Sequence, residues 1–213
     1  MSLLGVLKWR GQNKDAQLTE TATASRPSSD DHHQRGVVLA RRGLYTEALK
    51  EFKQVASMQP DDAQAHYNVG LAYFNLGRFE KAIKAYKRAL QIEPDYVDAY
   101  NNMGIAFDRM GRFLEAIKVY MQAIRVESNN VESRKNLGIA YFNIGSYMEA
   151  VKALRQALQI NPDDPDTHYF LGLIYTELKD KELALQEHQA LQDLKHPDTA
   201  RQLYDLIDRM HLR

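Results

Sequence analysis

The chain of 213 residues has no cysteine, which excludes a disulfide framework, thiolate metal ligands and a cysteine nucleophile. It also lacks a charge excess, since 28 basic residues balance 28 acidic ones. Nucleic-acid binding, which needs a basic surplus, is therefore not expected. No stretch approaches the roughly 18 apolar residues of a membrane span, and the apolar start at residues 3–9 is shorter than a secretory signal core. These absences favour a cytoplasmic protein.

Glycine is scarce, but its placement is periodic. Five of the 11 glycines recur at intervals of 34 residues, and four more follow the first four by seven residues. The same period carries five alanines. It divides the chain into five repeats, residues 29–62, 63–96, 97–130, 131–164 and 165–196. The periodic small residues are Gly36, Gly70, Gly104, Gly138, Gly172, Ala48, Ala82, Ala116, Ala150 and Ala184, with Gly43, Gly77, Gly111 and Gly145 at the second glycine position.

Each repeat predicts two helices. In the second repeat, apolar residues at spacings of three and four run over residues 63–76 and again over residues 79–92. Gly77 ends the first helix, because glycine adopts a left-handed conformation without steric cost, and Pro94 follows the second. The acidic or amide residues that follow the second helices are natural N-caps of the next first helix: Asp61-Asp62, Asp95, Asn129-Asn130 and Asp163-Asp164.

The repeat resembles the tetratricopeptide repeat (TPR) family, whose 34-residue unit reads W-x2-L-G-x2-Y, then A-x3-F, then P. The second repeat matches this pattern at His66, Val69, Gly70, Tyr73, Gly77, Phe79, Ala82, Tyr86, Ala89 and Pro94. The resemblance implies an all-α, right-handed superhelix whose first helices, here called helices A, form a concave groove for a protein or peptide partner. We expect residues 1–28 to be a flexible arm with an apolar tip, and residues 197–213 to form a C-terminal capping helix.

No pattern of residues supports catalysis. The chain has no glycine-rich phosphate loop, no G-x-S-x-G and no H-E-x-x-H. His32, His66 and His168 share one repeat position at which the family carries a large aromatic residue, so packing explains them better than metal binding. We therefore expect a non-enzymatic protein with no metal and no cofactor.

The groove positions of the resemblance are mostly apolar or amide. The ninth position of each helix A is aliphatic, and two phenylalanines stand at the twelfth, so an exposed apolar strip is expected along the groove. Packing between neighbouring helices A explains the same residues and stays open as an alternative. The strip consists of Val37, Leu71, Phe74, Ile105, Ile139, Phe142 and Leu173.

Beside the strip, the sixth position carries the amides of Gln34, Asn68, Asn102 and Asn136. A side-chain amide offers a donor and an acceptor, so such a ladder can pair with the peptide units of an extended segment. It resembles the asparagine ladder of O-linked N-acetylglucosamine transferases, although asparagine is common at this position across the family.

The second position carries Asp30, Asp98, Glu132 and Asp166, which we call the acidic rail. Cochaperones that clamp a C-terminal carboxylate carry lysine there, so that ligand is not expected, and the rail favours a basic or neutral one. Alternatively, these acids only complement the dipoles of their helices.

The second helices of the repeats suggest an alternative function. Lys50, Lys84, Lys118 and Lys152 recur at one position of the second helices and predict a basic stripe. Together with the apolar tip of the arm, this stripe suits a self-assembling scaffold, a homo-oligomer or one that contacts an anionic membrane. An adaptor or scaffold that holds a peptide segment in its groove is the first interpretation.

Overall fold

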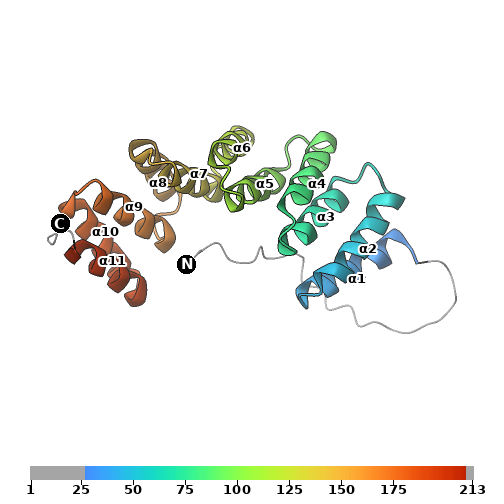
Figure 1. Ribbon diagram of the computed structural model, residues 1–213, viewed down its shortest axis with the longest axis horizontal. Helices are drawn as coiled ribbons and strands as arrows, with labels where there is room; N and C mark the ends of the chain where they lie inside the picture. The colour runs from blue at the N-terminus through green and yellow to red at the C-terminus, as the bar shows by residue number, and fades with distance from the viewer. Residues whose placement is uncertain (1–26, 210–213) are drawn as a thin grey trace. The chain divides into compact units, whose positions relative to one another are not determined.

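A computed structural model of the chain describes residues 27–209, and this part contains eleven α-helices and no strand. Figure 1 labels the helices in chain order. They are α1 Ser29–Arg41, α2 Tyr45–Met58, α3 Ala63–Asn75, α4 Phe79–Ile92, α5 Val97–Arg109, α6 Phe113–Val126, α7 Val131–Asn143, α8 Tyr147–Ile160, α9 Pro165–Glu177, α10 Lys181–Asp193 and α11 Pro197–Arg209. The expected all-α repeat fold is confirmed. Within the described residues, no helix is long and apolar enough to cross a membrane.

The turn inside each of the first four repeats depends on a left-handed glycine, as predicted. Gly77 has a φ of 71°, and the other three glycines of this position also have positive φ. A residue with a Cβ is strained in this conformation, so glycine is the preferred one. The fifth repeat departs from the rule, because Lys179 takes the left-handed position with a φ of 60°.

The predicted N-caps are confirmed at three helices. The Asp62 carboxylate accepts hydrogen bonds from the backbone N–H groups of Gln64 and Ala65 at 2.8 and 3.2 Å. Asn130 caps α7 and Asp164 caps α9 in the same way. These bonds satisfy N–H groups that have no partner inside a helix, and they fix where these three helices begin.

Small residues let the two helices of a repeat approach closely. A Cβ on Gly70 of α3 would overlap the ring of Tyr86, which reaches across from α4 and is fully buried. Ala82 is also fully buried in α4. Gly70 thus makes room for the aromatic side chain that fills this repeat.

The chain forms two compact bodies, one ending at Ala106 and the other beginning at Phe107. In the first body, Phe52, Val69 and Ala72 lie in a core that joins the first two repeats. In the second body, Leu154, Leu171 and Leu203 belong to one core that extends from α8 to α11.

The C-terminal end of the second body is built differently from the inner repeats. Helix α11 contacts both α9 and α10, and its Leu203 occupies the space that a Cβ on Gly172 would need. The side chain that fills the equivalent space in the first, second and fourth repeats comes from the repeat's own second helix. Leu203 and Ile207 are buried, whereas Met210 and the apolar tip of the arm lie outside the described residues.

Candidate functional site

The structure corrects the expected exposure of the apolar strip. Leu71, Phe74, Ile105 and Ile139 are buried, so they contribute to the packing of neighbouring helices. Val37, Phe142 and Leu173 are only partly buried. The depth to which neighbouring helices cover these positions depends on tertiary packing, which their spacing in the sequence does not determine.

The amide ladder is buried as well, except for Gln34, which is exposed. In the first body, the Oδ1 of Asn68 accepts a hydrogen bond from Gln64 at 3.1 Å. The Nδ2 of Asn102 donates to the hydroxyl of Tyr67 at 2.7 Å. These two asparagines therefore take part in hydrogen bonds inside the protein.

Asn136, in the second body, differs from the other asparagines of the ladder. It is only 5% exposed, and its Nδ2 has no hydrogen-bond partner among the described residues. A buried donor without a partner is unfavourable by about 1–3 kcal/mol, so an added acceptor at this point would be bound favourably.

Aromatic and aliphatic side chains flank Asn136 on neighbouring helices. Ile139 and Phe142 follow it on α7 at spacings of three residues, which places them on one stripe of the helix. The adjacent helix α9 contributes Phe170 and Leu173, and the rings of Phe142 and Phe170 meet edge to face at 6.3 Å between centroids. We call these residues the α7–α9 face: Asn136, Ile139, Phe142, Phe170 and Leu173.

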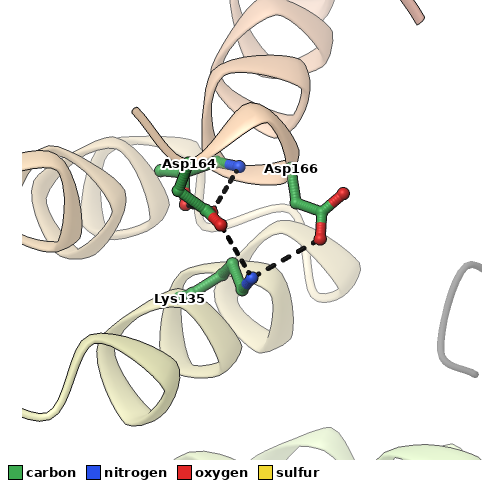
Figure 2. Close-up of polar contacts among 4 residues, drawn as sticks. Lys135, Asp164 and Asp166 are labelled. Carbon is green, nitrogen blue, oxygen red and sulfur yellow. Dashed lines mark hydrogen bonds and ion pairs between the residues drawn. The ribbon is translucent and has the colours of Figure 1, made fainter. Parts of the chain in front are cut away.

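A charged contact joins the two helices of this face (Figure 2). The Nζ of Lys135 on α7 lies 3.3 Å from Asp164 Oδ1 and 3.5 Å from Asp166 Oδ2, both at the start of α9. Burial opposes ionisation of Asp164, but hydrogen bonds from Thr167 and the charge of Lys135 outweigh it and lower the pKa of this carboxyl. Lys135 thus stabilises the N-cap of α9 in its ionised form and holds α9 against α7.

This contact changes the interpretation of the acidic rail. Asp166 shares the cation of Lys135, so its charge is partly neutralised within the protein. Asp30 and Glu132 are exposed and Asp98 is partly buried. A preference of the rail for basic ligands stays a prediction.

The four lysines of the predicted basic stripe, Lys50, Lys84, Lys118 and Lys152, are all exposed. Two neighbouring cations are engaged within the protein. Arg88 contacts Asp61 at 3.3 Å, and Arg155 donates to the hydroxyl of Tyr175 at 3.1 Å.

The recurring histidines form hydrogen bonds within their own repeat or to the end of the preceding one. His168 Nδ1 lies 2.6 Å from Glu187 and its Nε2 lies 2.8 Å from the carbonyl oxygen of Pro162. The bond to Glu187 raises the pKa of His168, burial opposes this, and the Pro162 carbonyl adds to the rise. No cluster of residues that could hold a metal ion occurs in the described part of the chain.

Sequence reasoning missed one buried polar pair. The hydroxyl of Tyr120 donates to Asp108 Oδ2 at 2.7 Å, while Asp108 Oδ1 has no partner among the described residues. Burial raises the pKa of Asp108 to about 6, against the opposing effect of the hydrogen bond from Tyr120. An acidic residue at the twelfth position of helix A, where two other repeats carry phenylalanine, was the available signal.

Stacked helical hairpins with a 34-residue period, left-handed glycine turns and a partly exposed helix A face define a helical-repeat interaction scaffold. The family model described as TPR repeat matches residues 36–77, 70–111, 109–145 and 140–179. The chain therefore belongs to the TPR family, whose members are protein–protein interaction scaffolds and typically not enzymes.

Solved structures show the same fold. The structure titled "MamA 41-end from Desulfovibrio magneticus RS-1" is 21% identical, with a TM-score of 0.73, over 79% of this chain and 96% of that one. TTC0263, a thermophilic TPR protein in Thermus thermophilus, is 23% identical, with a TM-score of 0.65, over 84% of this chain and 99% of that one. No curated protein matches the chain.

Proposed function

We propose that the chain is a non-enzymatic scaffold that holds an extended peptide segment of a partner protein on the α7–α9 face. The observation that supports this proposal is the buried Nδ2 of Asn136, which has no hydrogen-bond partner within residues 27–209, beside the partly exposed Phe142, Phe170 and Leu173. The amide would donate to a peptide carbonyl, and the apolar side chains would contact the side chains of the segment. Because Asn136 is buried, binding requires a small movement of the side chains that cover it.

The size of each contribution follows from general values. One net hydrogen bond contributes about 0.5–1.5 kcal/mol, while micromolar affinity corresponds to about 8 kcal/mol. The apolar contacts must therefore contribute most of the binding free energy, with Asn136 setting the register of the peptide backbone.

A display library of random peptides, selected on the full chain, supplies the probe for a direct test. Asn136→Ala should weaken a selected peptide about 2- to 10-fold, as expected for one hydrogen bond, and Phe170→Ala should weaken it more. Asn68→Ala is the matched control, because it removes the same amide from the same repeat position in the other body. Equal affinity of Asn136→Ala and wild type, or an equal loss in Asn68→Ala, would contradict the proposal.

The exposure of Lys50, Lys84, Lys118 and Lys152 favours a second candidate, an assembly scaffold that contacts anionic surfaces through its basic stripe. Sedimentation with phosphatidylserine vesicles tests the stripe, and light scattering tests self-association. A protein that stays monomeric and unbound in both assays would exclude this candidate.

A further inference from the structure

A pocket of about 710 Å³ lies between α10 and α11, at the C-terminal end of the second body. Its size falls within the usual range for ligand sites. It does not include any residue of the α7–α9 face. The lining residues are His188, Gln192, Lys195, Pro197, Ala200, Arg201 and Tyr204.

The charged residues of the lining are basic, whereas most of its exposed surface is apolar. Lys195 and Arg201 carry positive charge, and no lining residue is acidic. Glu187 of α10 contacts His168 at 2.6 Å. Asp193 accepts a hydrogen bond from the neutral Gln189 at 2.9 Å and keeps its charge, and Asp198 and Asp205 of α11 are exposed. No ion pair of Lys195 or Arg201 occurs within residues 27–209. The two cations are therefore available to an anionic group.

A histidine and a tyrosine form one wall of the pocket. The Nδ1 of His188 lies 2.9 Å from the carbonyl oxygen of Ala200, and a carbonyl can only accept, so Nδ1 carries the proton. This orientation leaves Nε2 as the ring nitrogen that a ligand can use. The ring of Tyr204 lies 5.3 Å from that of His188, and Tyr204 remains 49% exposed.

The turn that carries Lys195 is a copy of the turn before it. Leu194, Lys195 and His196 form the same backbone hydrogen bonds as the three residues that connect α9 to α10. Lys195 has a φ of 61° and Lys179, the matching residue of the earlier turn, has a φ of 60°. Lys179 does not line the pocket, so the two lysines differ chiefly in what lies beside them.

We propose that this pocket binds an acidic peptide segment of a partner, with a carboxylate between Lys195 and Arg201 and an apolar side chain against Pro197, Ala200 and Tyr204. The two cations favour a carboxylate, because a basic residue would be repelled and a neutral one would gain no electrostatic attraction. An ion pair alone buries little surface. The contacts with Pro197, Ala200 and Tyr204 add buried apolar area. This second site does not depend on the α7–α9 face.

The test uses a fluorescein-labelled peptide, Gly-Asp-Glu-Phe-Glu-Asp-Gly, and its Asn/Gln counterpart with the full chain. The acidic peptide should bind measurably more tightly, and its affinity should fall as salt is raised. The double variant Lys195→Gln with Arg201→Gln should weaken it at least tenfold, and Tyr204→Ala should also weaken it. Because Lys195, Arg201 and Tyr204 are exposed, these variants should retain the helical circular dichroism of wild type.

Lys179→Gln serves as the matched control and should bind as wild type does. Chemical shift changes should centre on His188, Ala200 and Tyr204. The proposal is overturned if the neutral peptide binds equally well, if Lys179→Gln loses as much as the double variant, or if the shifts lie elsewhere. Binding of a single-stranded oligo-dT in preference to the acidic peptide, with the same loss in the double variant, would assign the pocket to nucleic acid and also overturn it.

Discussion

Tyr86 and Tyr120 occupy the same position of consecutive repeats, yet their replacement by phenylalanine should have opposite effects. Both side chains are fully buried. The Tyr120 hydroxyl donates to Asp108 at 2.7 Å, whereas the Tyr86 hydroxyl has no partner among the described residues. Each substitution removes one oxygen and leaves the ring in place, so packing hardly changes.

The expected magnitudes follow from the two environments. An unpaired buried hydroxyl is unfavourable by about 1–3 kcal/mol, so Tyr86→Phe should raise the free energy of unfolding, by about 1 kcal/mol. A hydrogen bond to a charged acceptor contributes about 1.5–3 kcal/mol, so Tyr120→Phe should lower the free energy of unfolding by about that amount at pH 7 or above, where Asp108 is mostly ionised.

The effect of Tyr120→Phe should also depend on pH. Because the pKa of Asp108 is raised to about 6, the folded protein holds this proton more tightly than the unfolded chain, whose aspartate pKa is about 3.9. Asp108 therefore lowers stability as pH rises from about 4 through 6. Tyr120→Phe removes the hydrogen bond that stabilises the ionised form of Asp108, so stability should fall further with rising pH. The free energy of unfolding of the variant should therefore differ from that of wild type more at pH 8 than at pH 4.

Urea unfolding followed by circular dichroism at 222 nm, at pH 4 and pH 8, measures both variants. Repeat proteins can unfold in parts, so hydrogen exchange should confirm that each change acts in the repeat that carries it. Equal destabilisation by the two substitutions, or a pH-independent loss in Tyr120→Phe, would refute the reasoning.

Three further changes test other contacts. Lys135→Met should lower the free energy of unfolding by about 1–2 kcal/mol, since it leaves the partly buried Asp164 without its cation; a smaller loss at pH 2 than at pH 7 by urea unfolding would support the ion pair. His168 has a raised pKa, so its contribution is complete below about pH 6.5 and lost as pH rises through the folded pKa; His168→Gln should flatten thermal stability over that range, and an unchanged profile would contradict it. Ala116→Leu should overpack a fully buried position and lower the free energy of unfolding by about 1–3 kcal/mol. A thermal melt that matches wild type would show that the position has room for the larger side chain.

The sequence predicted the local structure well because local chemistry determines it. A left-handed glycine ends each of the first four helices A, and Asp62, Asn130 and Asp164 cap the helices that follow. These features depend on a few neighbouring residues, which the 34-residue period displays directly.

The exposure of the site could not be predicted in this way. Phe74 and Phe142 occupy the same groove position in two repeats, but one is buried and the other partly exposed, because their neighbours on adjacent helices differ. The contact of Lys135 with Asp164 and Asp166 links residues 29 and 31 positions apart, and it depends on how α9 lies against α7.

The sequence contains a sign of the C-terminal pocket that does not follow the 34-residue period. Leu178-Lys179-Asp180 and Leu194-Lys195-His196 are similar triplets at a spacing of 16 residues, and both form left-handed turns. Helix α11 follows the second of these turns and contacts both α9 and α10.

Hydrogen exchange of the full chain, with and without a display-selected peptide, tests the α7–α9 face most directly. Bound peptide should slow exchange in α7 and α9, around Asn136 and Phe170, and leave α6 and α8 unchanged. Protection confined to the second helices of the repeats, or to the first body, would show that the partner segment binds elsewhere.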